Sequence, residues 1–158
     1  MYNINDYLVY GKDVCKVYEI IEENDLTYYL LRPEKDQSLK IKIPTTSDKI
    51  RKLISKEDLN SLINKIKDIK IIEADQKYIE TEYKKLLINP THEDLISIIK
   101  TTYLRNKKRL DNNQKTAEKD TKYLELAEQY LYTEISIVLN ISYTDTKNYI
   151  IEQLKQYK

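Results

Sequence analysis

The sequence predicts an α+β fold, with a small β module first and a helical domain after it. Up to Pro44, short runs rich in β-branched and aromatic residues alternate with polar breaks, which is typical of strands. After Pro44 the apolar residues recur at helical spacing. The 158 residues suit one ordinary domain or two small ones. We place the β module, with a trailing helix, at residues 1–70 and an all-helical domain at residues 71–158.

Four short strands are expected in the first 44 residues. Glycine, asparagine, aspartate and proline supply the turns between them. The breaks lie at Gly11–Asp13, Asn24–Asp25 and Pro33–Gln37. We therefore expect consecutive strands joined by short connections.

The fourth strand, "LKIKIP", has two unlike faces because side chains alternate along a strand. Leu39, Ile41 and Ile43 share one face, which we expect to be core. Lys40 and Lys42 share the other, which we expect to meet water. Taken alone, such lysines are a solvated face or a guard against edge pairing.

After Pro44 the spacing of the apolar residues changes to that of helices. Residues 47–53 predict a short helix, and Ser55 is placed to cap the next one, with Glu57 and Asp58 in its first turn. A polar gap at residues 72–75 is the expected domain boundary.

Three or four further helices are expected beyond this gap. Asn89 and Pro90 end the first, and Thr91 caps the second with Asp94 three residues later. A similar cap begins at Ser142. The apolar stripes are Ile79, Tyr83, Leu86 and Leu87; Leu95, Ile98, Ile99 and Tyr103; Leu124, Ala127, Leu131, Ile135, Val138 and Leu139; and Tyr149, Ile150 and Leu154.

The composition excludes several classes of chemistry. Gly11 is the only glycine, so neither a P-loop nor a dinucleotide-binding fingerprint can be formed. Cys15 and His92 are the only residues of their kinds, which leaves too few ligands for a histidine-based metal site. We expect His92 to lie at a surface helix terminus. We expect no cofactor and no enzymatic activity, with a hydrolase using unpaired carboxylates as the remaining enzymatic alternative.

Charge and hydropathy bear on partners and location. The 27 basic and 26 acidic side chains nearly cancel, so any attraction to nucleic acid must be local. No apolar run is long enough to span a bilayer. A single cysteine fits a reducing compartment, and we expect a cytoplasmic protein.

One local basic cluster stands out, "KTTYLRNKKR" at residues 100–109. It has two readings of similar weight. Clustered cations bind phosphates, and cations near the end of a helix also complement its dipole. The basic residues are Lys100, Arg105, Lys107, Lys108 and Arg109.

The order of these pieces resembles the CarD/CdnL family of bacterial transcription regulators, over nearly the whole chain. The resemblance implies a Tudor-like β-barrel module followed by a compact helical domain. The segments that carry it are "NINDYLVYGKDVCKVYEI", "TYYLLR", "LKIKIP", "ISKEDL", "LISIIKTTYLRN" and "LAEQYLYTEISIVLNIS" running into "IIEQL".

The resemblance implies that the β module binds the β subunit of RNA polymerase. Lys42 matches a position that is often basic in the family, and it would face an acidic surface of the polymerase. Asn24 falls where relatives often have arginine, and Leu26 follows in the same connection. An amide lacks the charge and the fork geometry of a guanidinium, so this part of the resemblance is weaker.

The resemblance also implies that the helical domain contacts promoter DNA and stabilises the open complex. Relatives typically insert a tryptophan into the minor groove, but this chain has none, and Asp75 or Gln76 occupies that place. Tyr78 is a candidate displaced wedge, although a tyrosine there more often packs against its neighbours. The basic candidates for DNA contact are Lys77, Lys100, Arg105, Lys107 and Lys108.

We therefore expect a non-enzymatic, monomeric transcription regulator. It should bind RNA polymerase through the β module, and promoter DNA weakly, without sequence preference and with strong salt dependence. The alternative is a divergent paralogue that acts as a protein–protein adaptor without DNA binding.

Overall fold

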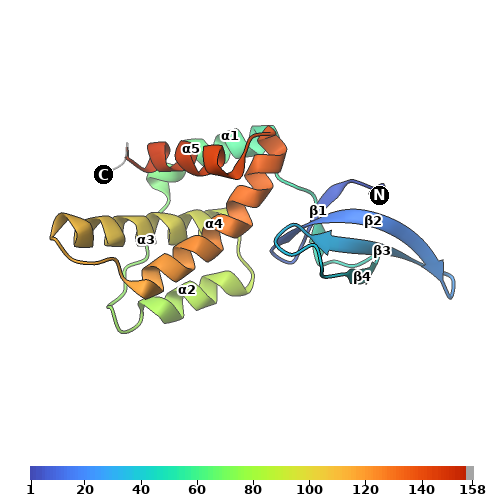
Figure 1. Cartoon of the computed structure of the whole chain (residues 1–158), viewed down its shortest axis with the longest axis horizontal. Coiled ribbons are helices and arrows are strands. Elements are labelled where there is room, and N and C mark those ends of the chain that lie inside the picture. The colour runs from blue at the N-terminus through green and yellow to red at the C-terminus, as the bar shows by residue number, and fades with distance from the viewer. Residues whose placement is uncertain (156–158) are drawn as a thin grey trace. The chain divides into compact units, whose positions relative to one another are not determined.

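The computed structural model describes residues 1–155. Its contacts divide the chain into two compact units, Met1–Ile54 and Ser55–Lys158. The first unit is a β sheet and the second is helical (Figure 1). The α+β class predicted from the sequence is confirmed.

The first unit is a five-stranded antiparallel sheet in the order β4-β3-β2-β1-β5. The sheet is open, with β4 at one edge and β5 at the other, so the expected closed Tudor-like barrel is not formed. The strands are β1 (Tyr7–Tyr10), β2 (Asp13–Glu23), β3 (Leu26–Pro33), β4 (Ile41–Pro44) and β5 (Ile50–Arg51).

The β2–β3 hairpin turns through a two-residue loop. Glu23 pairs with Leu26, which leaves Asn24 and Asp25 as the loop, with φ angles of 51° and 63°. Two successive positive φ angles define the turn that matches the twist of antiparallel strands, and Asn and Asp tolerate them better than other non-glycine residues. Asn24 is therefore placed here by backbone geometry. Gly11, at φ 64°, provides the corresponding turn between β1 and β2.

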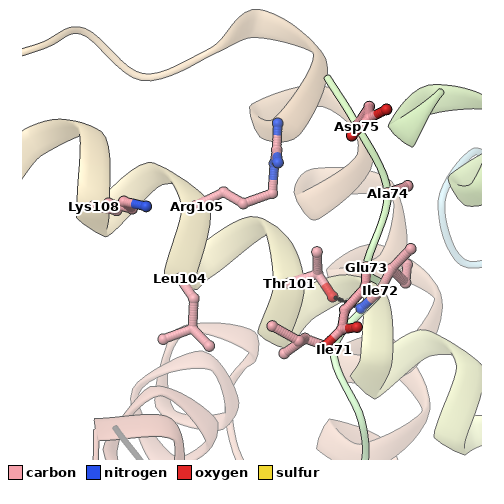
Figure 2. Close-up of a pocket in the computed structure, with 9 residues that line it drawn as sticks. All are labelled: Ile71, Ile72, Glu73, Ala74, Asp75, Thr101, Leu104, Arg105 and Lys108. Carbon is pink, nitrogen blue, oxygen red and sulfur yellow. Dashed lines mark hydrogen bonds between the residues drawn. The ribbon is translucent and has the colours of Figure 1, made fainter. Parts of the chain in front are cut away.

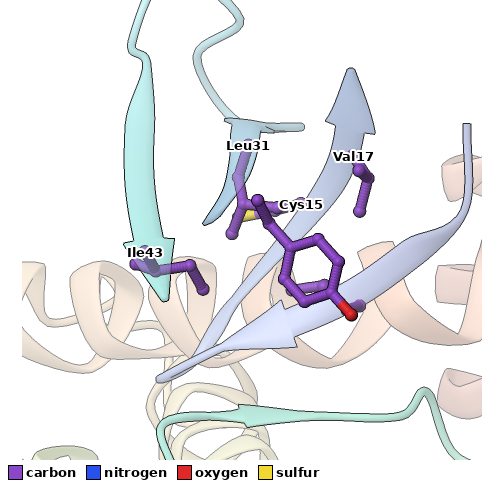
Figure 3. Packing of buried hydrophobic residues seen from close by; sticks show 6 residues of the cluster. Cys15, Val17, Leu31 and Ile43 are labelled. Atoms are coloured by element: carbon purple, nitrogen blue, oxygen red, sulfur yellow. The ribbon is translucent and has the colours of Figure 1, made fainter. Parts of the chain in front are cut away.

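One face of the sheet carries the core of this unit (Figure 3). The Tyr29 hydroxyl accepts a hydrogen bond from the backbone N–H of Tyr2 at 3.0 Å, which satisfies its polar end. In β4, Ile43 is buried and Ile41 packs against the core, as predicted. Leu39 precedes the strand and is 48% exposed, so its expected core position is wrong. The cluster comprises Leu8, Cys15, Val17, Tyr29, Leu31 and Ile43.

The helix predicted over residues 47–53 is also wrong. Ile50 and Arg51 form β5 and pair with β1, and the Gly11 N–H donates to the Lys49 carbonyl at 2.9 Å. Ile50 packs against the sheet core. A partner strand outside the segment thus decides its conformation.

Over its described residues, 55–155, the second unit contains five α-helices and one short 3-10 helix, η1. The helix that the sequence assigned to the β module, α1, belongs to this unit and packs against η1 and α4. The division therefore falls at Ile54–Ser55 instead of near residue 70. The elements are α1 (Lys56–Asn64), η1 (Ile66–Asp68), α2 (Ile79–Ile88), α3 (His92–Asp111), α4 (Glu118–Leu139) and α5 (Tyr143–Lys155).

The predicted helix caps are confirmed. The Ser55 hydroxyl accepts from the Asp58 N–H at 3.0 Å. Thr91 and Asp94 form a reciprocal capping box at the start of α3. Such caps satisfy backbone donors that a helix leaves unpaired at its first turn.

The core of the helical unit lies mainly between α3 and α4, which make its most extensive interhelical contact. Ile98 and Ile99 of α3 and Leu131 and Ile135 of α4 are almost fully buried. Among the helices described, none combines the length and the apolar character needed to cross a bilayer.

Candidate binding surfaces

The partner-binding residues predicted in the β module meet at the turn of the β2–β3 hairpin. Lys42 Nζ lies 2.5 Å from Glu23 Oε2 and 4.6 Å from the centre of the Tyr28 ring. Glu23 pairs with Leu26 across the hairpin, and Asn24 follows it in the turn. We call this region, residues 22–26 with Lys42, the hairpin end.

The hairpin end is exposed and carries both apolar and charged groups. Leu26 is 55% exposed. The side chains of Lys42 and Glu23 are 43% and 53% exposed, so their ion pair adds little to stability and is easily exchanged for another. Together with Asp25, Glu23 makes the turn acidic. A partner must therefore present an apolar contact for Leu26 and compete with Glu23 for Lys42.

Lys100 has a structural role that its place in the basic cluster did not reveal. Its side chain is buried, at 7% exposure. Its ammonium donates to the carbonyls of Ile66 and Ile69 at 2.9 Å and of Lys67 at 3.3 Å. Burial lowers the pKa of this ammonium. The expectation that Lys100 contacts DNA is therefore withdrawn, because its donors are used to hold η1 against α3.

Arg105 is also engaged within the unit. Its Nε donates to both carboxylate oxygens of Asp120, at 3.1 and 3.2 Å, and Asp120 is fully buried. The Tyr83 hydroxyl donates to the same carboxylate at 2.7 Å. A terminal nitrogen of Arg105 donates to the side-chain oxygen of Gln76, which also accepts from Arg109 at 3.2 Å. Arg105 therefore acts first as a bridge between α3, α4 and the segment before α2.

This bridge includes Gln76, one of the two residues expected from the sequence at the place of a tryptophan. Gln76 is tied to two arginines of α3, and the Asp75 carbonyl accepts from the N–H groups of Tyr78 and Ile79 at the start of α2. Both candidates for the wedge position thus serve the internal structure of the helical unit.

Lys77 and Tyr78 form an exposed corner before α2. Tyr78 is 55% exposed, and the Lys77 ammonium lies 5.5 Å from the centre of its ring. The expectation that this tyrosine packs against its neighbours is wrong, since the residue is mostly exposed to solvent. An exposed aromatic ring beside a cation is suited to stacking on a base or on another aromatic group.

Lys107 and Lys108 differ in exposure. Lys107 is half-buried and Lys108 is exposed. Lys108 lies in the last turn of α3, where it also complements the helix dipole. Together with Arg105 it lines a cavity of about 590 Å³ beside the segment before α2 (Figure 2).

The residues that organise the helical unit were missed by sequence reasoning. Asp120 and Gln76 give no pattern of their own, because what they share is a partner, Arg105, which lies 15 and 29 residues away. Tyr83 joins them only through Asp120, 37 residues away. Only the excess of basic over acidic residues around Arg105 hinted that a distant carboxylate would pair with it.

The cysteine and the histidine named in the sequence analysis both have structural surroundings. Burial raises the pKa of the Cys15 thiol to about 12, so it is not a reactive thiolate. His92 begins α3 and its Nε2 lies 3.0 Å from Glu134 Oε1, which agrees with a helix-terminus position but makes it partly buried. Within residues 1–155, no group of three histidine, cysteine, aspartate or glutamate side chains is placed to hold a metal ion.

Comparison of the sequence with models of known protein families and with individual characterised proteins finds no match.

Proposed function

We propose that this chain is a non-enzymatic, monomeric regulator of bacterial transcription initiation. Its hairpin end binds the β subunit of RNA polymerase in the cytoplasm, and its helical unit makes weak, secondary contact with promoter DNA. The choice of polymerase and promoter as partners rests on the resemblance to the CarD/CdnL family. The exposed residues of the structure support the choice of contact surfaces.

The observation that carries the proposal is the convergence of Asn24, Leu26 and Lys42 at the hairpin end. An exposed leucine rimmed by exchangeable charges has the make-up of a protein-binding patch, with an apolar centre and a polar rim. Lys42 changes its partner from Glu23 to a carboxylate of the polymerase. Asn24 contributes by holding the turn, not by direct recognition.

The DNA surface is smaller than the sequence suggested. With Lys100 and Arg105 engaged internally, it consists of Lys77, Tyr78, Lys107 and Lys108. Each phosphate contact contributes a slope of about 0.9 to the dependence of log K on log salt, so few contacts give weak binding. Such an interaction matters only once the polymerase holds the protein near the promoter.

Binding of the full chain to a β-subunit fragment tests the polymerase contact. Leu26→Asp and Lys42→Glu should each weaken binding at least about tenfold. Glu23→Gln should strengthen it, because it releases Lys42. The matched controls are Leu39→Asp and Lys40→Glu, exposed residues of the same types outside the hairpin end. Equal loss in controls and test variants would contradict the proposed surface.

Binding of the full chain to duplex DNA tests the second contact. Replacing Lys77 and Lys108 by glutamine should reduce the salt dependence, and Tyr78→Ala should weaken binding at constant salt slope. Lys84→Gln with Lys119→Gln, two exposed lysines outside this surface, is the control. Tight, sequence-specific binding by the wild-type chain would argue against the proposal.

The adaptor alternative is favoured by one observation, the use of Lys100 and Arg105 within the unit. If the helical unit binds a protein instead of DNA, the Lys77 and Lys108 variant should retain full promoter activity in a transcription assay. A regulator should lose part of that activity. Lys100 and Arg105 are left unchanged in this test because their removal would disturb the fold.

A further inference from the structure

Two adjoining cavities form a groove along α3 in the helical unit. Their volumes are about 590 and 610 Å³, within the range of ligand and peptide sites. Ile71, Glu73 and Leu104 line both cavities, so the two meet at these residues. Figure 2 shows one of them, between α3 and the segment that leads into α2. We call the pair the α3 groove.

The middle of the α3 groove is apolar. Ile71 is 41% exposed, whereas the next residue, Ile72, is half-buried. Leu104 is half-buried on the facing helix. Neither residue takes part in the hairpin end or in the proposed DNA surface. Together they offer an apolar site for one side chain of a ligand.

Exposed lysines lie at both ends of the groove, beside Asp68 at one end and Asp75 at the other. Lys67 and Lys70 are exposed at one end, and Lys108 is exposed at the other. Lys100 and Arg105 also line the groove, but their donors are engaged within the unit. In all, five lining side chains are basic and three are acidic, the acidic ones being Asp68, Glu73 and Asp75.

The wall formed by the segment before α2 has unpaired backbone groups. Two backbone groups of this segment are paired with α3. The Lys70 carbonyl accepts from Ser97 Oγ at 2.8 Å, and the Ile72 N–H donates to Thr101 Oγ1 at 2.8 Å. The N–H and C=O groups of Ile71 and Glu73 have no hydrogen-bond partner among residues 1–155. Donors and acceptors therefore remain available beside the apolar site.

We propose that the α3 groove binds an extended peptide in which an apolar side chain is flanked by acidic ones. The apolar side chain lies between Ile71 and Leu104. The flanking carboxylates pair with Lys108 at one end and with Lys67 and Lys70 at the other. The peptide backbone supplies both donors and acceptors for the unpaired groups of the wall.

A nucleic acid fits the same groove less well. A phosphate accepts hydrogen bonds but cannot donate, so the free carbonyls would stay unpaired. A peptide backbone, in contrast, can donate to the free carbonyls of the wall.

Fluorescence anisotropy with the full chain tests this inference. The probe is a labelled peptide with one leucine between pairs of glutamates. The comparison peptides replace the leucine by serine or the glutamates by lysine. We expect binding of the first peptide and at least about tenfold weaker binding of the other two. Amide shifts in NMR spectra should concentrate at Ile71, Glu73 and Leu104.

Matched variants locate the binding site. Ile71→Ser should weaken peptide binding about tenfold, while Ile88→Ser, an exposed isoleucine at the end of α2, should leave it unchanged. Lys108→Glu should weaken it and Lys84→Glu should not. Absence of binding up to about 1 mM peptide, equal binding of the lysine peptide, or an unaffected Ile71→Ser variant would overturn the proposal. Because Ile71 lies outside the polymerase and DNA surfaces, Ile71→Ser should leave both of those interactions intact.

Discussion

Lys100 and Lys108 lie about two turns apart on α3, yet they perform different tasks. Lys108 is exposed and available to a ligand. Lys100 is buried, and its ammonium replaces water as the partner of three backbone carbonyls. The role of a basic side chain here is decided by whether the protein supplies acceptors for it.

Lys100→Met should destabilise the helical unit by about 1–3 kcal/mol, because it leaves carbonyls of η1 and the following residue without their donor. Urea unfolding of the full chain measures the loss. Lys67→Met, an exposed lysine in η1, should change the free energy of unfolding by no more than about 0.5 kcal/mol. An equally small effect of Lys100→Met would show that water replaces the ammonium without cost.

Glu128 should make stability depend on pH. Burial raises the pKa of its carboxyl above the ordinary 4.5, and the nearby Lys147 opposes that rise. Because the folded-state pKa is raised, the contribution of Glu128 is most favourable below pH 4.5 and is lost as the pH rises through the folded-state value.

Glu128→Gln should therefore be more stable than the wild type at neutral pH, and the difference should disappear in acid. Unfolding in urea across this pH range measures it. The control is Glu125→Gln, which changes an exposed carboxyl of the same helix. A constant difference at every pH would mean that packing, not ionisation, separates the two proteins.

At the scale of elements, the β2–β3 hairpin shows how a backbone requirement limits a binding residue. Asn24 and Asp25 occupy the left-handed region in a two-residue loop. An arginine, which the resemblance would lead us to expect at Asn24, would have to adopt the same positive φ. In this chain, the turn and not recognition explains the amide.

Asn24→Arg should cost about 1 kcal/mol of stability, whereas Asn24→Gly should cost less than about 0.5 kcal/mol. Thermal unfolding of the full chain distinguishes these outcomes. If arginine is accepted without loss, the turn does not account for the departure from the family pattern.

At the scale of the whole molecule, the division between the units decides which helix stabilises which core. Leu59, Leu62 and Ile63 of α1 are all less than 10% exposed. Their helix packs against η1 and α4, inside the second unit. Since the carbonyls held by Lys100 come from η1 and the residue after it, α1, η1 and α3 form one structural group.

A chain cut at Ile54–Ser55 should give two folded pieces. A piece that begins at residue 71 should be less stable than one that begins at Ser55 by more than about 3 kcal/mol, because it loses the buried side chains of α1. Urea unfolding of both pieces measures the difference. Equal stabilities would place the division near residue 70, where the sequence first suggested it.

Features that depend on neighbours along the chain could be predicted from the amino-acid sequence. The turn at Asn24–Asp25, the cap at Ser55 and the capping box at Thr91 follow from side chains that act within four residues of themselves. The spacing of hydrophobic residues likewise predicted where the strands and helices lie. The exception is residues 47–53, where pairing with β1 overrides the local pattern.

Which charged residues are available for binding depends on how the elements pack in three dimensions. The carbonyls that hold Lys100, the carboxylate that holds Arg105 and the groove beside Leu104 all bring together residues far apart in sequence. Burial and long-range hydrogen bonds depend on how the elements pack, and no local pattern encodes a partner 34 residues away. For that reason the sequence predicted a basic cluster, whereas the fold uses Lys100 and Arg105 internally and leaves Lys108 exposed.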